Sequence, residues 1–301
     1  MPSYALGIDL GGTNLRLAAF RPDGQMLDKV SVPTNIGAGR EALVESIVSG
    51  IHQLQAARSG EGLLGIGIGV PGFILLEKGI VTKSPNLPGL ENFPIRDTLR
   101  NRLGSPVLLE NDANAAALGE KWMGAGRGVD DLVLLTLGTG IGGGIISGGK
   151  VLHGYLGMAG ELGHLTVEPH DGASCGCGAT GCLEAHASAT AISRMAREAG
   201  LGELTSHQVY DAAISGDPRA RHIFERMGQA LGLGLALLIN TFNFPLYLLS
   251  GGVLAAWDLF APAMLEECRR RSLTFRQTDT RIDKATLGEE AGLYGAARLA
   301  L

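Results

Sequence analysis

The chain has 301 residues, of which 45% are hydrophobic and 46 are glycine, and its net charge is −5. This length is enough for one large core or two smaller ones, and the hydrophobic fraction excludes a disordered chain. The acidic balance argues against nucleic acid and anionic membranes as partners, because both call for clusters of basic residues. The chain begins directly with a strand-like segment, so we expect no signal peptide and a cytoplasmic location.

The first half is predicted to alternate strands and helices. Residues 4–10 alternate in hydrophobicity as a half-buried strand does, and a glycine turn leads to a second strand at 15–20. Three further strands are predicted at 25–32, 63–70 and 106–111. Three helices are predicted at 39–57, 94–103 and 112–122. We place a domain boundary near the last of these helices.

The second half repeats this plan, with a strand at 131–137, a glycine turn and a returning strand at 144–149. Helices are predicted to dominate 183–240. The most apolar stretch, 231–249, is interpreted as helix, turn and strand, because polar residues and a proline interrupt it. The last predicted elements are a helix, a strand and a closing helix, at 257–271, 281–287 and 289–301. We hypothesise two related lobes, 1–115 and 116–288, with helix 289–301 packed on the first.

Two glycine-rich turns between strands are candidate phosphate-binding loops. Backbone amides in such turns can bind phosphate oxygens, and a threonine hydroxyl adds a donor. The two turns comprise Gly11, Gly12 and Thr13, and Gly138, Thr139 and Gly140. Asp9, at the end of the first strand, is a candidate Mg²⁺ ligand through water. Each turn alone also fits a plain hairpin, but their equivalent positions in the two halves favour binding of a triphosphate.

Asn111 and Asp112 lie between a predicted strand and the alanine-rich helix. An aspartate here is a good N-cap, and the local sequence by itself favours that structural role. The position also suits a catalytic base, because the helix dipole favours an ionised carboxylate that accepts a proton from an attacking hydroxyl.

Three of the four cysteines stand in the segment SCGCGATGCLE, with the spacing C-x-C-x4-C. Cys175, Cys177 and Cys182 are too close in sequence to make good disulfide partners, and the cytoplasm disfavours disulfides. With His164 they form a closed tetrahedral set for a structural Zn²⁺, the alternative being a reduced loop without metal. Cys268 is predicted to be an ordinary buried thiol.

Glu161 and Glu184 lie on either side of this loop. A metal in the loop would fix the direction of both carboxylates. Carboxylates combined with asparagine and histidine suit a polyhydroxylated ligand such as a sugar, whereas the simpler alternative is two solvated glutamates.

Several segments together resemble the ROK family (repressors, open reading frames and sugar kinases). They are DLGGTN, LENDANAAALGE, LGTGIGGGIISGGKVLHG, AGELGHLTVEP, CGCGATGCLEAHASATAI and NFPLYLLSGGV. The likeness runs from Asp9 to the last helix, and the cysteine motif with its upstream Glu-x-Gly-His is the most specific part. It implies an α/β, two-lobed actin-like ATPase (ribonuclease H-like) fold with the active site in a cleft between the lobes.

The resemblance also implies ATP-dependent phosphorylation of a hexose, with ATP, Mg²⁺ and a structural Zn²⁺ as cofactors. Asp112 would be the base that deprotonates the sugar hydroxyl. The residues implied to bind the sugar are Asn111, Asp112, Glu161, His164 and Glu184, with Asn86 as a further contact and His164 also a zinc ligand. Gly251 and Gly252 would line the adenosine pocket, and the assembly would be a homodimer or homotetramer without nucleic acid.

Within this family, glucose kinase is favoured, because Glu161, His164 and the segment CGCGATGCLEAHAS look most like glucokinases. The runner-up is a kinase for N-acetylglucosamine or another hexose or N-acetylhexosamine. A sugar-responsive repressor would carry an N-terminal helix-turn-helix, for which the position of Asp9 leaves no room. Many members have lysine where this chain has Asn14, so a lysine contact with phosphate is not expected there.

Overall fold

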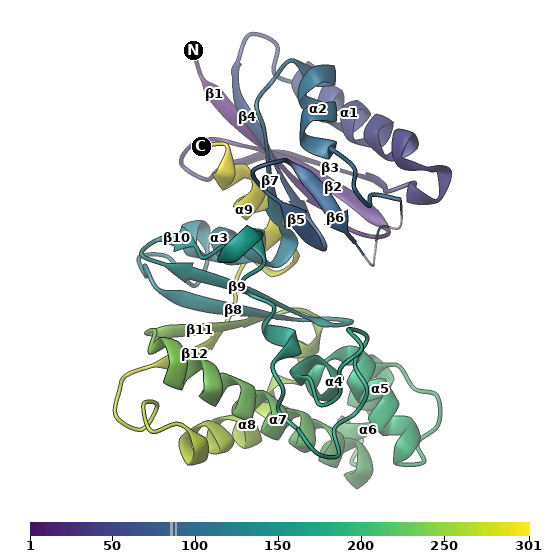
Figure 1. Cartoon of the computed structure of the whole chain (residues 1–301), viewed down its shortest axis with the longest axis vertical. Coiled ribbons are helices and arrows are strands. Elements are labelled where there is room, and N and C mark those ends of the chain that lie inside the picture. The colour runs from purple at the N-terminus through teal and green to yellow at the C-terminus, as the bar shows by residue number, and fades with distance from the viewer. Residues whose placement is uncertain (85–86, 88) are drawn as a thin grey trace. The chain divides into compact units, whose positions relative to one another are not determined.

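The structure is a computed structural model that describes residues 1–84, 87 and 89–301 (Figure 1). The chain divides into two compact units. The first contains Met1–Asp130, Gly144–Gly160 and Ala285–Leu301, and the second contains Asp131–Gly143 and Glu161–Lys284. Both units combine sheet and helix, as the alternation of sequence patterns predicts.

The first unit is built on a five-stranded sheet with the order β3-β2-β1-β4-β7. Strands β1 to β3 form an antiparallel series, whereas β4 runs parallel to both β1 and β7. These strands, with the separate hairpin β5–β6, are β1 (Ser3–Leu10), β2 (Asn14–Phe20), β3 (Met26–Pro33), β4 (Gly62–Val70), β5 (Phe73–Leu75), β6 (Ile80–Lys83) and β7 (Val107–Asn111).

Helices cover both faces of this sheet, because successive side chains of a strand point to opposite faces. On β2, Leu17 packs with the buried face of α1, whereas Phe20 packs with Leu293 of α9. Gly67 in β4 lets α9 lie close, since a Cβ there would overlap the carbonyl of Ala296. The helices and 3-10 turns of this unit are α1 (Arg40–Ala56), α2 (Ile95–Leu103), α3 (Asp112–Met123), α9 (Ala291–Leu299), η1 (Ile36–Ala38), η2 (Tyr155–Gly157) and η5 (Gly288–Glu290).

Helix α3 belongs wholly to the first unit, because it packs on α9. A Cβ on Gly295 would overlap the carbonyl oxygen of Ala115. The buried carboxylate of Glu120 also accepts a 2.7 Å hydrogen bond from the amide of Leu287, just before α9. The unit that contains this helix continues to Asp130, whereas the sequence analysis placed a boundary near the helix.

We expect Gly295→Ala to destabilise the protein by about 1–3 kcal/mol, because the added methyl group forces α3 and α9 apart. Urea unfolding followed by circular dichroism measures the change. Gly37→Ala is the matched control, since nothing lies within 4 Å of a Cβ at Gly37. Equal urea midpoints for the two variants would contradict the close approach of the helices.

A second five-stranded sheet has the order β10-β9-β8-β11-β12. Strands β9 and β10 are antiparallel, and β11 runs parallel to both β8 and β12, so this sheet repeats the pattern of the first. The strand–glycine turn–strand unit predicted in each half is confirmed as β1–β2 and β8–β9. The strands are β8 (Leu132–Leu137), β9 (Ile141–Ser147), β10 (Lys150–Val151), β11 (Leu246–Ser250) and β12 (Arg281–Lys284).

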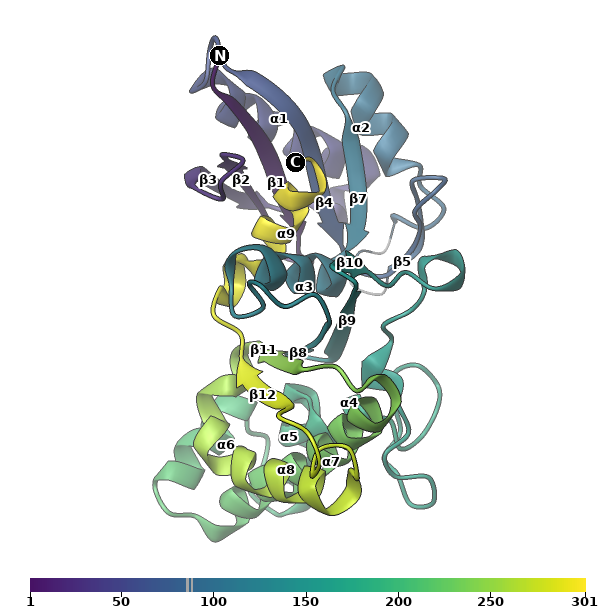
Figure 2. The same cartoon turned by 90° about the vertical axis from the view of Figure 1, so that its left-hand side faces the viewer.

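The second unit is rich in helices, as predicted, and its long helix α7 lies beside α8 in both views (Figures 1 and 2). Helix α7 ends at Phe242 and is capped by Asn243, whose φ of 51° closes the helix before β11. The apolar stretch 231–249 is thus helix, turn and strand, as the sequence predicts. The helical elements are η3 (Leu162–His164), α4 (Leu183–Ala187), α5 (Ala189–Glu198), α6 (Ser206–Ile214), α7 (Pro218–Phe242), η4 (Gly252–Ala256) and α8 (Trp257–Arg271).

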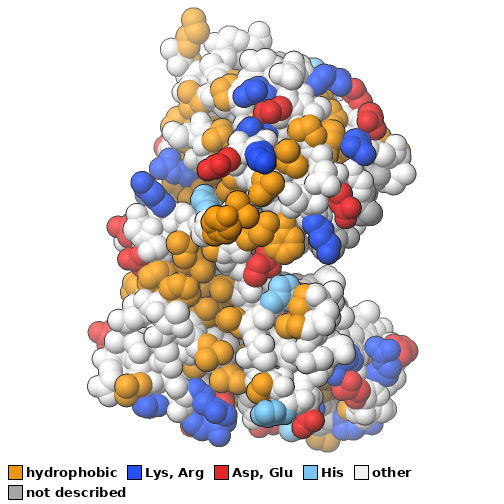
Figure 3. Space-filling view, viewed as in Figure 1, with side chains coloured by type: hydrophobic (Ala, Val, Ile, Leu, Met, Phe, Trp, Pro, Cys, Tyr) orange, Lys and Arg blue, Asp and Glu red, His pale blue; other side chains and the backbone are white. Residues whose placement is uncertain are grey.

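Across the described ranges, no helix is both long and apolar enough to cross a membrane. On the face shown in Figure 3, basic side chains are interspersed with acidic ones. That face therefore presents a mixed charge pattern instead of a single field of one sign.

Candidate active site

The first glycine turn joins β1 to β2 in the first unit. The amide of Gly11 donates to the carbonyl of Asn14 at 3.1 Å. Thr34 holds the turn from the side, because its hydroxyl donates to the Gly11 carbonyl at 2.7 Å and its amide donates to the Thr13 carbonyl at 3.0 Å. Gly12 and Thr13 are exposed, so this part of the turn is accessible to phosphate oxygens.

Asp9 is paired with an arginine that the sequence analysis did not single out. Arg16 lies opposite Asp9 in the β1–β2 register and donates to its carboxylate at 2.5 Å. Burial raises the pKa of Asp9, and the charge and hydrogen bond of Arg16 act in the opposite direction. A cation bound at Asp9 would therefore share this carboxylate with a guanidinium. The register of a hairpin with a three-residue turn was the available signal for this pair.

The structure corrects the predicted N-cap of α3. Asn111 is the cap, and its side-chain oxygen accepts from the amides of Ala113 at 2.9 Å and Asn114 at 3.2 Å. Asp112 is instead the first helical residue, and its Oδ1 accepts from the Ala113 amide at 2.9 Å. The structural role of N-cap, which the sequence favoured for Asp112, therefore belongs to the neighbouring Asn111.

The second glycine turn joins β8 to β9 and is fixed to the start of α5. The Gly138 amide donates to the Gly140 carbonyl at 3.0 Å, and the Gly138 carbonyl accepts from the Ala189 amide at 2.9 Å. The hydroxyl of Thr190 donates to the Thr139 carbonyl at 2.8 Å. These bonds turn the loop carbonyls toward the helix, as a phosphate-binding loop requires if its amides are to face an anion.

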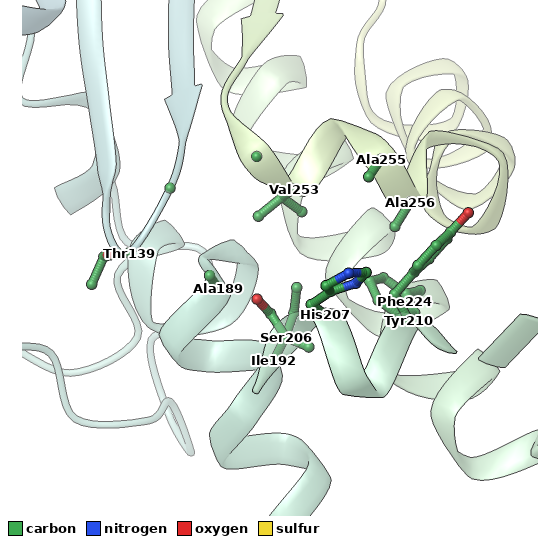
Figure 4. A pocket seen from close by; sticks show the side chains of 12 residues that line it. Thr139, Ala189, Ile192, Ser206, His207, Tyr210, Phe224, Val253, Ala255 and Ala256 are labelled. Carbon is green, nitrogen blue, oxygen red and sulfur yellow. The ribbon is translucent and has the colours of Figure 1, made fainter. Parts of the chain in front are cut away.

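A pocket of about 470 Å³ opens beside this loop within the second unit (Figure 4). Its lining is mostly apolar and comes from the glycine turn, α5, α6, α7 and η4: Gly138, Thr139, Ala189, Ile192, Ser206, His207, Tyr210, Phe224, Gly252, Val253, Ala255 and Ala256. Of the two predicted glycines, Gly252 lines it, whereas Gly251 packs against the Leu137 carbonyl with a φ of 100°. A mostly apolar pocket beside a candidate phosphate-binding loop suits the nucleoside part of a nucleotide.

Most of this lining escaped sequence reasoning. Ile192 and Phe224 each lie among apolar residues at helical spacing, so each looks like an ordinary core residue. His207 and Tyr210, whose rings stack with centroids 6.4 Å apart, occur one helical turn apart on α6 without any motif around them. Among the residues around this pocket, only the glycines of the turns form a sequence motif that predicts a binding site.

The predicted metal ligands converge in the second unit. Within the described residues, the ligand atoms of His164, Cys175, Cys177 and Cys182 all lie within 4.8 Å of one another. His164 Nδ1 is 3.6 Å from Cys175 Sγ, and the sulfurs of Cys177 and Cys182 are 3.7 Å apart. A tetrahedron with zinc–sulfur bonds of about 2.3 Å has edges of about 3.8 Å, so the donor set fits Zn²⁺.

Local backbone bonds shape this metal loop. The Cys175 amide donates to the Ala179 carbonyl at 2.8 Å, and the Gly178 amide donates back to the Cys175 carbonyl at 3.0 Å. Gly181 has a φ of 75° and touches the Glu168 backbone, which a side chain would prevent. Cys268, by contrast, is fully buried on α8, as predicted.

The two glutamates lie against the metal loop. Glu161 Oε2 is 3.9 Å from His164 Nε2, on the ring edge opposite the cysteines. Burial raises the pKa of Glu161, while His164 lowers it and Glu184 raises it further. Glu184 contacts Cys175 through Oε1 at 3.6 Å and accepts from the Ile141 amide through Oε2 at 2.8 Å. One carboxylate therefore joins the metal loop to the second glycine turn.

The structure thus groups the predicted residues unit by unit. Asp9, the first glycine turn, Asn111 and Asp112 stand at strand ends of the first unit. Glu161, Glu184, the metal ligands and the second glycine turn stand together in the second unit. Asn86 lies outside the described residues.

Two sheets of the same strand order, each with a glycine turn after its first strand, define the two-domain actin-like ATPase fold, as predicted. The ROK family model matches residues 5–301, so the chain belongs to the ROK family. The glucokinase of Thermotoga maritima is 41% identical, over 99% of this chain and 98% of its own.

Solved structures agree with this assignment. The ROK hexokinase from Thermus thermophilus is 40% identical with a TM-score of 0.89, and the match covers 98% of this chain and 96% of that one. A ROK family glucokinase from Streptomyces griseus, in complex with glucose and AMPPNP, is 35% identical with a TM-score of 0.80 and 98% coverage of both chains.

Proposed function

We propose that this protein is an ATP-dependent hexose kinase that converts glucose to glucose 6-phosphate. The observation that carries the proposal is the position of Glu184, whose carboxylate bonds to the Ile141 amide directly after the glycine turn and also contacts the metal loop. A group suited to sugar hydroxyls therefore lies directly beside a group suited to phosphates. The likeness to glucokinases, one of them described with glucose and AMPPNP, supports this assignment.

The proposed reaction is an in-line transfer of the γ-phosphoryl group. Asp112 accepts the proton of the attacking sugar hydroxyl as its oxygen bonds to phosphorus, and ADP leaves with the electrons of the broken P–O bond. The sugar hydroxyls are bound by Asn111, Glu161, His164 and Glu184. Amides of the two glycine turns hold phosphate oxygens, and Asp9 holds Mg²⁺, which neutralises charge on the phosphates when bound.

We further propose that His164 and the three clustered cysteines bind a structural Zn²⁺. The observed spacing of the four donor atoms supports this assignment. A closed four-ligand site supplies no reactive position, so its contribution is to fix the loop that carries the sugar-binding carboxylates. Thiolate ligands require a reducing compartment, which agrees with a cytoplasmic location. From the family resemblance, the proposed assembly is a homodimer or homotetramer.

The pocket of Figure 4 is proposed to hold the nucleoside of ATP. We expect Ala255→Trp, which fills this pocket, to raise KM for ATP by about tenfold or more, while KM for glucose stays within about twofold. Ala199→Trp, at the exposed end of α5, is the matched control. Initial rates at varied ATP concentration give KM for ATP in both variants. An unchanged KM for ATP in Ala255→Trp would mean that the nucleoside binds elsewhere.

The proposed function is tested by ADP release from purified protein with Mg²⁺ and ATP against a panel of hexoses and N-acetylhexosamines. We expect the highest kcat/KM with glucose. A preference for N-acetylglucosamine would keep the mechanism and replace the substrate. Absence of turnover with every sugar, in protein that still binds glucose by calorimetry, would favour a sensing role instead.

A further inference from the structure

A buried carboxylate lies directly behind the proposed catalytic segment. Glu110, the residue before Asn111, has a side chain that is only 3% exposed. Its Oε1 accepts from the Asn111 amide at 3.0 Å and from the Asn114 side-chain amide at 3.1 Å. Glu110 therefore holds both sides of the turn between β7 and α3, where Asp112 begins the helix.

The other oxygen of this carboxylate faces a histidine from a distant part of the chain. His153 Nε2 lies 2.7 Å from Glu110 Oε2. His153 follows β10, and its own backbone is held by the Ala159 amide, which donates to the His153 carbonyl at 3.0 Å. Because Glu110 has only acceptor atoms when ionised, Nε2 must carry a proton in this contact.

The network reaches Asn111 by two routes. Glu110 fixes the Asn111 amide, and Asn114, which Glu110 also binds, donates its own amide to the Asn111 side chain at 3.2 Å. The Asn111 side chain also donates to the Gly72 carbonyl at 3.3 Å. A rotation of the Glu110 carboxylate would break the bonds that set the backbone of Asn111 and Asp112, and a buried carboxylate without its partner is strongly disfavoured.

We propose that His153 is a positioning residue, which fixes the Glu110 carboxylate and through it orients Asn111 and Asp112 toward the sugar hydroxyl. This role rests on the proposed kinase function. It is distinct from sugar binding, because the imidazole acts on the Glu110 carboxylate.

The pH dependence of this contact has a defined direction. Glu110 on β7 is the charged group that acts on His153, and its hydrogen bond raises the pKa of His153 above the ordinary 6.5, with burial opposing. For a raised histidine pKa, the favourable ion pair is complete below the ordinary value and is lost as pH rises through the raised one. Positioning therefore weakens on the alkaline side.

Two variants of His153 test the proposal. His153→Phe keeps a planar ring and removes the donor, and we expect kcat/KM for glucose to fall by about 10²-fold, the scale of a misplaced catalytic geometry. His153→Gln keeps a donor at the Nε2 position without a titrating charge. We expect it to retain activity within about tenfold of wild type at neutral pH and to lose the alkaline fall in kcat that we expect of wild type. KM for ATP should stay within about twofold in both variants.

The matched control is His222→Gln, because His222 is exposed and contacts Glu225 at 3.2 Å, a histidine–carboxylate pair away from the site. Thermal unfolding of each variant separates loss of fold from loss of positioning. A folded His153→Phe protein with wild-type kcat/KM would overturn the proposal. If His153→Phe does not fold, a His153→Gln protein with the wild-type pH profile overturns it instead.

Glucose affinity, measured by calorimetry, keeps this test separate from the proposed function. Wild-type protein that binds glucose without phosphorylating any sugar contradicts the kinase assignment. In that case a weaker glucose affinity in His153→Phe still supports the orientation of Asn111, whereas unchanged affinity contradicts it.

Discussion

Asp112→Ala is expected to lower kcat by about 10²–10⁴-fold, the range for loss of a general base. The structure strengthens this expectation, because capping of α3 is performed by the Asn111 side chain and does not depend on Asp112. In Asp112→Ala the Asn111 cap therefore remains, while the proton acceptor is lost together with the bond that Asp112 accepts from the Ala113 amide. Steady-state kinetics at saturating glucose and ATP, together with thermal unfolding, measure the two effects separately.

The control for this prediction is Asp97→Ala. Asp97 also lies in the first turn of a helix, α2, where its carboxylate interacts with the helix dipole and with Arg96. Any generic effect of deleting a carboxylate near a helix N-terminus appears in this variant too. Activity of Asp112→Ala within tenfold of wild type, or a loss matched by Asp97→Ala, would end the assignment of Asp112 as base.

Local patterns explain why much of the fold was predictable. The strand–glycine turn–strand units are continuous in sequence, and alternation and glycine placement report directly on such hairpins. The convergence of the four candidate metal ligands was also predictable, since three of them lie within one short segment and His164 stands eleven residues before Cys175. In each case the residues that act together are neighbours in the chain.

Features that depend on tertiary packing could not be predicted from the sequence. The sequence favoured Asp112 as cap, but the choice between two adjacent cap-forming residues depends on where β7 ends. The packing partner of α3 could not be read from local patterns, because the contact of Gly295 with Ala115 joins segments 180 residues apart. The apolar lining around Ile192 likewise follows from tertiary contact, which one sequence does not encode in any local motif.

The metal loop links these observations to function. Glu184 is the first-turn acidic residue of the five-residue helix α4, and Cys182 is the residue that precedes this helix. A helix this short has little stability of its own, so its position depends on what anchors it. Zinc on Cys182 would anchor α4 at its start and so fix Glu184 beside Ile141. Metal binding would therefore hold the Glu184 carboxylate in the position proposed for sugar binding.

Loss of zinc is therefore expected to remove sugar binding before it removes the fold. We expect purified protein to hold about one zinc per chain, measured by elemental analysis, and Cys182→Ser to hold much less. Its kcat/KM for glucose should fall by about 10–100-fold or more, the scale seen when groups that support a metal site are lost. Limited proteolysis should cut the segment between Glu161 and Glu184 faster than in wild type.

Cys268→Ser is the matched control, because this thiol is buried on α8 and donates to the Gly232 carbonyl at 3.3 Å, a bond that a serine hydroxyl can keep. It should retain zinc, the proteolysis pattern and activity, so that loss in Cys182→Ser reports on the metal and not on cysteine content. Wild-type protein that is fully active without zinc would contradict the structural role of the metal. A zinc content of Cys182→Ser equal to that of wild type would show that the four-ligand set is wrong. The orientation of Glu184 would then depend on its bond to the Ile141 amide and not on zinc.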